Sequence, residues 1–101
     1  MHNIRYTELA EDDLSDLFSI IYKDKPTDAL EYIDKLENFI GLLEDNPFMG
    51  IECIKKHINR DCRVLIYENY LIFYTVGIDE ILIIRVLNVH TEYALLLDLK
   101  D

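Results

Sequence analysis

The stretch from Arg60 to His90 decides the fold of this chain. It reads RDCRVLIY over residues 60–67, YLIFYTV over 70–76 and ILIIRVLNVH over 81–90. β-Branched and aromatic residues dominate all three runs, which is typical of strands. Glu68-Asn69 has the length of a two-residue hairpin turn, and we expect Asn69 to adopt the positive φ that such turns require. A second turn falls at residues 77–80, so the stretch predicts three consecutive strands joined by two turns.

Alternation along the last run predicts which of its side chains share a face of the sheet. The two expected faces are Ile81, Ile83, Arg85 and Leu87 on one side, and Leu82, Ile84 and Val86 on the other. Arg85 is notable because a charge in the middle of an apolar strand is costly unless it is paired or opens to a cleft. Its head group either projects from a concave sheet face toward a target or pairs with a helix acid such as Glu37 or Asp34. The acid-rich helices favour the second interpretation.

Two amphipathic helices are predicted before the strands. Thr7 can cap a helix that ends near residues 22–24, and its apolar face repeats at helical spacing through Ala10, Leu14, Leu17, Phe18 and Ile21. Pro26 favours a second helix start, with Asp24 or Thr27 as the N-cap, and this helix must end before Pro47. Its apolar stripe is Ala29, Ile33, Leu36, Ile40 and Leu43.

The order of elements predicts an α+β fold. Residues 3–7 suggest a short first strand, and residues 91–99 suggest a short C-terminal helix capped by Thr91. We therefore expect one domain over residues 1–101, in which a helical hairpin packs on a mainly antiparallel sheet of three to four strands. Its element order is β-α-α-β-β-β, followed by the short helix.

Charge is unevenly distributed along the chain, whose formal net charge is −10. Residues 1–50 contain twelve acidic and four basic side chains, whereas the segment 55–63 is basic through Lys55, Lys56, Arg60 and Arg63. A strongly acidic protein is unsuited to binding nucleic acid over a wide surface, because neutralising phosphates needs many lysines and arginines. A focused site for an anionic target in the basic segment, with Lys55, Lys56 and Arg60 as contacts, stays open beside the alternative that these side chains belong to a solvated turn.

The two cysteines and the N-terminus indicate the compartment. Cys53 and Cys62 are too few for a disulfide framework, and we expect them to be free thiols of a reducing cytosol. No apolar run approaches the ~18 residues of a membrane span, and no signal region is visible. The sequence thus predicts a cytoplasmic protein. Cys53, His57, Cys62 and His90 match no standard zinc spacing, so neither a metal nor a cofactor is expected.

Three segments together resemble the RelE/ParE superfamily of bacterial type II toxins. Residues 26–50 are similar to the family's "P..A…L…L…P..G" segment, Arg63 with residues 69–74 resembles its "R…Y.I.Y" strands, and residues 83–87 resemble its last strand, written "I.RVLH". The match spans roughly residues 7–93. Asn88 stands where the family often has a histidine, and the family is usually basic. The long helical hairpin is closer to the ParE-like, or plasmid-stabilisation, branch.

The resemblance implies a growth-arresting toxin that is neutralised by a cognate antitoxin. The ParE-like branch implies inhibition of DNA gyrase without a catalytic set, and we prefer this interpretation. The RelE-like alternative is a ribosome-dependent mRNA endonuclease that acts on the ribosome and mRNA. Its candidate catalytic residues would be Arg63, Arg85, His90 and Tyr93, although Arg63 is as readily a surface arginine of an edge strand.

A third interpretation is an inactive family member that only binds a partner. Apolar sheet and helix surfaces suit a docked partner segment. Because the chain is acidic, we expect that segment to be apolar or basic. A homodimer or a hetero-oligomer with the antitoxin are both compatible with the sequence.

Overall fold

The computed structural model describes residues 2–56, 58 and 60–92. The elements in chain order are β1 (Asn3–Tyr6), α1 (Glu8–Asp24), α2 (Pro26–Gly41), the 3-10 helix η1 (Leu42–Glu44), β2 (Ile51–Glu52), the 3-10 helix η2 (Cys53–Lys56), β3 (Arg63–Tyr67), β4 (Tyr70–Val76) and β5 (Glu80–Asn88). In these ranges no helix combines the length and the apolar character needed to cross a membrane. The C-terminal helix predicted at residues 91–99 falls mostly outside the described residues.

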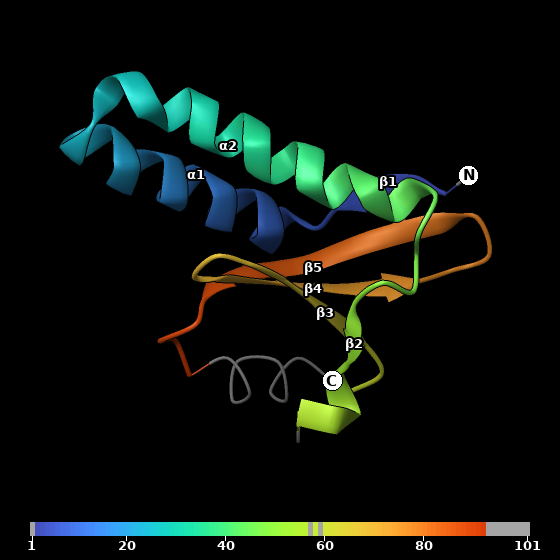
Figure 1. Ribbon diagram of the computed structural model, residues 1–101. Coiled ribbons are helices and arrows are strands. Elements are labelled where there is room, and N and C mark those ends of the chain that lie inside the picture. Colours follow the sequence, from blue (N-terminus) through green and yellow to red (C-terminus); the bar gives the residue numbers. More distant parts are fainter. Residues whose placement is uncertain (1, 57, 59, 93–101) are drawn as a thin grey trace.

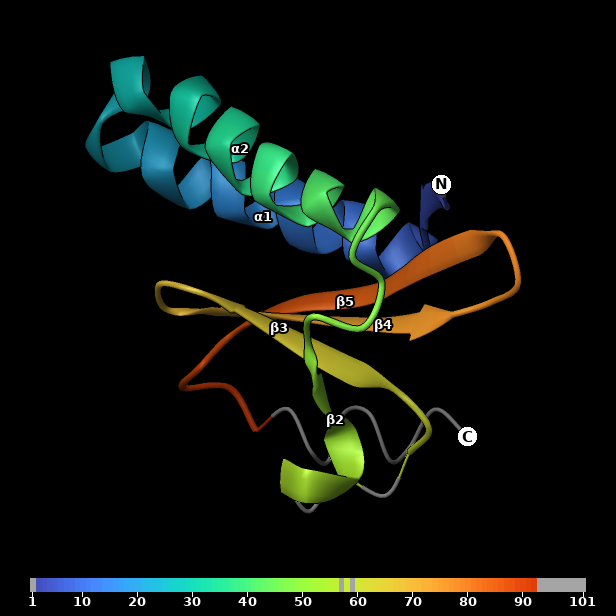
Figure 2. The same cartoon turned by 45° about the vertical axis from the view of Figure 1, so that its right-hand side comes forward.

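The molecule has two layers, with the α1–α2 hairpin packed on one face of the sheet (Figure 1). The strand order is β1-β5-β4-β3-β2, in which β1 runs parallel to β5 and the other neighbours are antiparallel. The predicted α+β class is confirmed. The sheet has five strands rather than three or four because β2 forms in a segment whose polar sequence carries no strand pattern. Figure 2 shows β2 and η2 reaching past the sheet, away from the helices.

Thr7 joins the start of α1 to the sheet. Its Oγ1 accepts a hydrogen bond from the backbone N–H of Ala10 at 3.1 Å, which confirms the predicted cap. The same hydroxyl donates to the carbonyl oxygen of Ile84 in β5 at 2.7 Å. The Thr7 side chain therefore satisfies a backbone N–H donor at the N-terminus of α1 and also fixes the position of α1 against the sheet.

The start of α2 differs from the prediction of a side-chain cap. Lys25 occupies the N-cap position, and no side chain bonds the first N–H groups, so neither Asp24 nor Thr27 acts as the cap. Pro26 stands in the first turn, where its missing N–H removes one of the donors that a cap would satisfy. The connection is also tight, since the N–H of Lys25 still bonds the Ile21 carbonyl of α1 at 2.7 Å.

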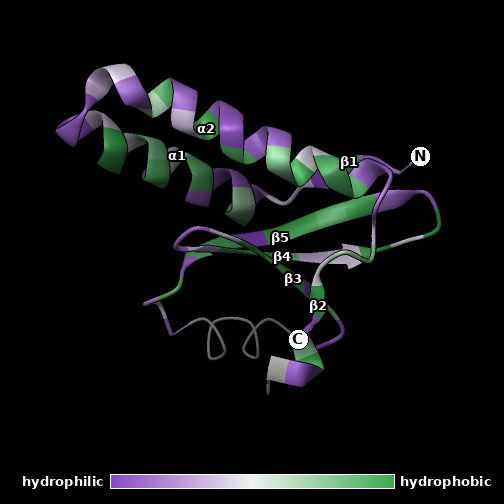
Figure 3. Ribbon diagram, viewed as in Figure 1, coloured by the Kyte–Doolittle hydropathy of each residue, from purple (hydrophilic) through white to green (hydrophobic). Residues whose placement is uncertain are grey.

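The main core lies between the helical hairpin and the sheet. The predicted apolar stripes face it, and the colouring of Figure 3 shows green alternating with purple along both helices. The fully or almost fully buried members of this cluster are Ala10, Leu17, Leu36, Ile40, Leu43, Leu65, Ile72, Tyr74, Ile81, Ile83 and Val86. A second cluster occupies the opposite face of the sheet, around Cys53, Ile58, Cys62, Val64, Leu71, Phe73, Ile84 and Leu87. The sheet is thus apolar on both faces.

The simple alternation predicted for β5 is wrong beyond Ile83. Phe73 pairs with Arg85 but the next residue, Tyr74, pairs with Ile83, so Ile84 is an extra residue in the ladder. This irregularity changes the phase of the strand: Val86 belongs to the same cluster as Ile83, and Leu87 belongs to the opposite one with Ile84. A bulge of this kind redirects the side chains beside it.

The β3–β4 hairpin has the predicted two-residue turn but a different strained residue. Tyr67 pairs with Tyr70, and the residue with positive φ is Glu68, at 52°, instead of Asn69. The Glu68 carboxylate accepts a hydrogen bond of 2.7 Å from the hydroxyl of Tyr32 in α2. We infer that this tertiary contact offsets the cost of roughly 1 kcal/mol that a non-glycine residue meets in the left-handed region.

The cysteines form a disulfide instead of the two free thiols predicted. Cys53 and Cys62 are joined across a sequence separation of 9, with their Cα atoms 5.3 Å apart. Backbone geometry brings them together, since the Cys53 N–H donates to the Cys62 carbonyl at 2.9 Å. The sequence could not show this, because it gives the number of cysteines and not their separation in space.

Reduction of this disulfide is expected to lower the free energy of unfolding by about 2–3 kcal/mol, the loop-closure entropy of a short loop. Urea denaturation with and without dithiothreitol measures the difference, and thiol titration reports the state of the bond. The Cys53→Ser/Cys62→Ser variant serves as a control, because its stability should not respond to the reductant. An equal response of both proteins would contradict the prediction.

The raised pKa of Tyr6 predicts that the free energy of unfolding falls at alkaline pH. Burial, and secondarily the negative charge of Glu37, raises the pKa of Tyr6 from 10.0 to about 12. The folded state therefore holds this proton more tightly, so the contribution is complete below pH 10 and is lost as the pH rises toward 12. Urea midpoints of the wild type and Tyr6→Phe, measured from pH 9 upward, should fall less steeply for the variant. Parallel curves would show that Tyr6 does not contribute.

Candidate functional site

Arg63, predicted as a catalytic or an edge-strand arginine, is enclosed by the loop that precedes β2. Its Nη1 donates to the carbonyl oxygens of Gly50 at 2.7 Å and Phe48 at 3.3 Å. Its Nη2 lies 3.7 Å from a carboxylate oxygen of Glu52, and the guanidinium carbon lies 5.0 Å from the centre of the Phe48 ring. The strand is not at the edge, because Glu52 of β2 pairs outside it. Arg63 therefore holds a loop in place.

Arg85 forms an ion pair with Asp13 of α1. Its Nε and Nη2 each donate to the Asp13 carboxylate at 2.9 Å, and the two side chains are 13% and 11% exposed. The hydrogen bonds to Asp13 raise the pKa of Arg85 above its ordinary value. The expected pairing with a helix acid is thus correct in kind, but the partner is on α1 and is neither Glu37 nor Asp34.

The edge of the sheet explains why α1 supplies that partner. β1 pairs with β5 only as far as Tyr6 opposite Ile83, so among the described residues no strand pairs with the later part of β5 on that side. Asp13 fills this position. Its carboxylate also accepts a hydrogen bond from the backbone N–H of Val86 at 2.9 Å. One carboxylate therefore neutralises the arginine and satisfies a backbone donor of the strand.

The other predicted site residues are described only in part. His90 lies in an exposed turn after β5, where its backbone N–H bonds Oδ1 of Asn88 at 2.9 Å. Lys55 is exposed on η2. Tyr93 and the side chain of Lys56 lie outside the described residues. β4 separates β3 from β5, and the guanidinium groups of Arg63 and Arg85 bond to different partners. The predicted catalytic set, which includes Tyr93, stays a prediction.

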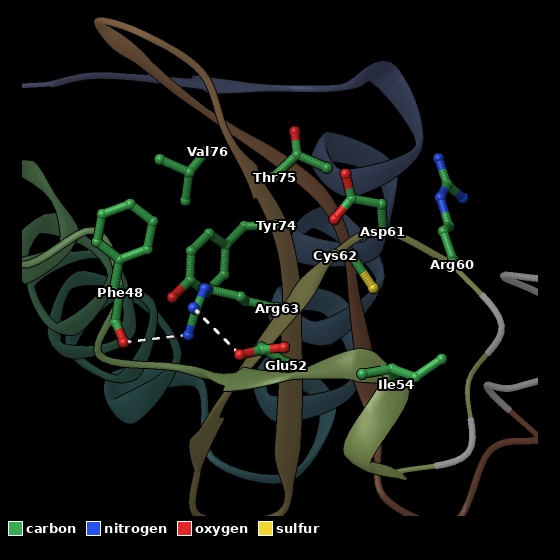
Figure 4. Close-up of a pocket in the computed structure, with 10 residues that line it drawn as sticks. All are labelled: Phe48, Glu52, Ile54, Arg60, Asp61, Cys62, Arg63, Tyr74, Thr75 and Val76. Atoms are coloured by element: carbon green, nitrogen blue, oxygen red, sulfur yellow. Dashed lines mark hydrogen bonds and ion pairs between the residues drawn. The ribbon is translucent and has the colours of Figure 1, made fainter.

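The larger of the two described clefts has a volume of about 860 Å³ and lies between the loop before β2, the start of β3 and the end of β4. Figure 4 shows Arg63 at its centre, between Phe48 and Glu52. The lining residues are Phe48, Glu52, Ile54, Arg60, Asp61, Cys62, Arg63, Tyr74, Thr75 and Val76. Of these, Arg60 and Arg63 were among the predicted residues. The apolar residues at positions 48, 49, 51 and 54 are the sequence signal that could have identified Phe48 and Ile54.

Tyr74 fixes one wall of this cleft. Its side chain is completely buried, and its hydroxyl donates to the Pro47 carbonyl and accepts from the Gly50 N–H, both at 2.9 Å. Burial raises the pKa of Tyr74, so the hydroxyl keeps its proton and can donate over the physiological range. The sequence presented Tyr74 as one more alternating strand tyrosine, with no sign of this role.

A smaller hollow of about 150 Å³ lies between α1 and the ends of β4 and β5. It is lined by Asp13, Asp16, Leu17, Ile20, Tyr70, Val86, Leu87 and Asn88. Asp13 is already engaged with Arg85, so the acidic side chain left at this hollow is Asp16. Within the described ranges, no three histidine, cysteine, aspartate or glutamate residues gather as metal ligands.

The comparison with protein families agrees with this fold. A family described as the ParE toxin of the type II toxin-antitoxin system, parDE, matches residues 4–93. The chain belongs to this family. A solved structure described as a chromosomal ParDE TA system from P. aeruginosa is similar, with a TM-score of 0.71 and 19% identity over 87% of this chain and 96% of that chain. At that identity the likeness is one of fold. Comparison with curated proteins gives no match.

In this ParE-family chain, the motifs that carried the resemblance fall on distinct parts of the fold. Residues 26–50 form α2 and the loop that Arg63 and Tyr74 hold, residues 63–76 form β3 and β4, and residues 83–87 lie in β5. The glycine that ends the first motif, Gly50, is packed against Tyr74 of the second. Family membership thus implies an antitoxin partner, and the motif residues described above maintain the framework.

Proposed function

We propose that this ParE-family toxin acts by inhibiting DNA gyrase and is neutralised by a cognate antitoxin. The observation that carries the proposal is the family match, which extends over almost the whole described chain. A ParE-like inhibitor acts by binding, so it needs surfaces and not a catalytic set. The cleft of about 860 Å³, with aromatic, aliphatic and charged walls, is compatible with that mode of action.

The positions of the arginines support an inhibitor over the RelE-like endonuclease. Cleavage of mRNA requires cations at the reacting phosphate and groups that transfer protons. Arg85 forms an ion pair with Asp13. Arg63 donates hydrogen bonds to two carbonyl oxygens and forms an ion pair with Glu52. Neither arginine is directed toward His90, which is exposed at the end of β5. No observation favours the nuclease over the inhibitor.

Induced expression together with a supercoiling assay tests the proposal. Expression should arrest growth, co-expression of the small protein encoded beside the toxin should relieve the arrest, and the purified chain should inhibit supercoiling by gyrase in vitro. Unchanged supercoiling at high molar excess of the protein would contradict gyrase inhibition. Messenger cleavage on translating ribosomes would instead support the endonuclease.

The third candidate is a family member that has kept only its partner binding. Harmless expression, combined with tight co-purification of the small neighbour, would support that candidate over both toxins. Growth arrest that the neighbour relieves would exclude it. The two measurements together therefore separate all three functions.

A further inference from the structure

The two cysteines occupy opposing positions where β2 meets β3. The last pair of the β2–β3 ladder is Glu52 with Arg63, and the next position of the same register places Cys53 across from Cys62. The Cys53 N–H donates to the Cys62 carbonyl oxygen at 2.9 Å, and the disulfide joins the two side chains. The 101 residues contain no other cysteine, so no third thiol of this chain competes for either sulfur.

The two sulfur atoms differ in their access from solvent. Cys53 is completely buried in the cluster on the face of the sheet that lies away from the helices. Cys62 is 6% exposed and lines the large cleft, and Figure 4 shows its sulfur among the lining side chains. The cleft volume of about 860 Å³ lies in the range of pockets that take small molecules. A small reagent that enters the cleft therefore reaches Cys62 and not Cys53.

The charges of the cleft do not favour one sign of reagent. Its charged lining residues are two acids and two bases, namely Glu52, Asp61, Arg60 and Arg63. Arg63 and Glu52 are also paired with each other, at 3.7 Å between Nη2 and the carboxylate oxygen. Exchange between thiols and disulfides depends on which sulfur can be reached. Access therefore sets the order in which the two cysteines react.

The two cysteines should stay close together when the disulfide is reduced. Gly50, which precedes β2, donates its N–H to the Tyr74 hydroxyl at 2.9 Å, and its carbonyl oxygen accepts from Arg63 at 2.7 Å. These contacts hold the N-terminal side of β2 independently of the disulfide. The disulfide closes the C-terminal side. Bond formation between the two thiols is thus an intramolecular step that proximity favours.

We propose that Cys53 and Cys62 form a reversible thiol–disulfide exchange site, which small thiols and their disulfides enter through the cleft at Cys62. The oxidised state closes the C-terminal side of β2 against β3, and the reduced state releases it. In a reducing compartment of the kind that the sequence predicts, protein disulfides are usually transient or redox-sensing. This site goes beyond the proposed inhibition of gyrase, and its chemistry is measured without gyrase or an antitoxin.

Oxidation takes place in two exchange steps, with a small disulfide such as glutathione disulfide as the oxidant. The Cys62 thiol first loses its proton and attacks the small disulfide, so that one glutathione is bound to Cys62 and the other leaves as a thiolate and takes up a proton. Cys53 then loses its proton and attacks the Cys62 sulfur, which forms the protein disulfide and releases the second glutathione in the same way. Two electrons and two protons pass from the protein to the small disulfide. Reduction by glutathione follows these steps in reverse.

A redox titration tests whether the site is reversible. The folded wild type is equilibrated at a series of ratios of glutathione to glutathione disulfide, starting from both the oxidised and the reduced protein. Alkylation traps the free thiols, and mass spectrometry counts them. The oxidised fraction should follow the ratio, and the two starting states should give the same curve. A protein that stays fully oxidised or fully reduced at every ratio would overturn the proposal.

Single-cysteine variants test the entry at Cys62. Cys53→Ser keeps the sulfur at the cleft, and Cys62→Ser keeps the buried sulfur. With glutathione disulfide, Cys53→Ser should form its glutathione adduct at least about tenfold faster, because exchange requires access to the reacting sulfur. Circular dichroism and thermal unfolding verify that both variants are folded. Equal rates in the two folded variants would overturn the assignment of Cys62 as the entry.

A competition in the reduced wild type tests the same point without a substitution. A limiting amount of iodoacetamide should label Cys62 roughly tenfold more than Cys53, as peptide mass spectrometry measures. Predominant labelling of Cys53 would overturn the order of the two steps.

Amide hydrogen exchange tests what the disulfide holds. Reduction should raise the exchange rate of the Cys53 N–H, which bonds the Cys62 carbonyl, by roughly tenfold. The Gly50 N–H is the internal control, because Tyr74 holds it in both states and its exchange should not change. Equal exchange of the Cys53 N–H in the oxidised and reduced proteins would overturn the proposed release of β2.

Discussion

Replacing Arg85 by methionine is expected to lower the free energy of unfolding by about 3 kcal/mol, because it leaves the carboxylate of Asp13 without its counter-ion in a largely buried position. Asp13 is 11% exposed and keeps only its hydrogen bond from the Val86 N–H. Methionine retains most of the volume and apolar contact of the arginine stem, so the loss reports mainly the uncompensated charge. Urea denaturation at neutral pH measures it.

A second ion pair in the same sheet serves as the matched control. Arg5 lies 3.3 Å from Glu80 across the β1–β5 pair, but its side chain is 68% exposed. Arg5→Met should therefore change stability by no more than about 0.5 kcal/mol. Similar losses for Arg5→Met and Arg85→Met would show that burial is not the cause and would contradict the argument.

A double-mutant cycle separates the pair from its surroundings. Asp13→Asn removes the charge but keeps an oxygen that can accept from the Val86 N–H. Combined with Arg85→Met, it should recover part of the stability that Arg85→Met loses on its own. Additive losses would indicate that the two side chains do not interact. The same measurement controls any activity assay of an Arg85 variant, since lost activity counts as catalytic only where the protein remains folded.

Replacing Gly50 by alanine is expected to cost about 2–3 kcal/mol through overpacking. A Cβ at this position would lie 2.6 Å from the Tyr74 hydroxyl oxygen and 2.8 Å from the carbonyl oxygen of Val64. The first contact belongs to a buried ring that is hydrogen-bonded at its end, and the second belongs to the backbone of β3. Neither can move away easily, so the loop before β2 must shift. Thermal and urea unfolding measure the loss.

Gly41 provides the control, because an added Cβ there meets no atom within 4 Å. It ends α2, and Gly41→Ala should stabilise the protein by up to about 1 kcal/mol through helix propensity. Tyr74→Phe in the Gly50→Ala background should relieve the contact with the hydroxyl but not the one with Val64. Full recovery in that double variant, or a loss at Gly41 equal to that at Gly50, would contradict this account.

Local patterns in the sequence were sufficient to predict the elements that depend only on residues close together in the chain. The Thr7 cap, the breaks at Pro26 and before Pro47, and the apolar stripe from Ala29 to Leu43 all depend on neighbours within a few residues. The β3–β4 hairpin could be predicted for the same reason. The family resemblance carried this further, because the order and spacing of several weak motifs are more specific than any one of them.

The candidate site could be predicted only in part. Arg60 and Arg63 were identified as charged residues of a basic segment, and both line the cleft. The partners of Arg63 were not, because the carbonyl oxygens of Phe48 and Gly50 have no signature in the sequence. Phe48, Glu52 and Asp61 became relevant only once β2 was placed beside β3.

The sequence by itself thus determined the helical hairpin, the three long strands and the family. Tertiary structure decided the partner of Arg85, which is 72 residues away, the disulfide, the bulge at Ile84 and the loop that Tyr74 holds 24 residues away. The physical reason is that the periodicities of helices and strands arise between residues only a few positions apart in the sequence. Pairing of distant side chains depends instead on where whole elements pack, and that is fixed by the core they share.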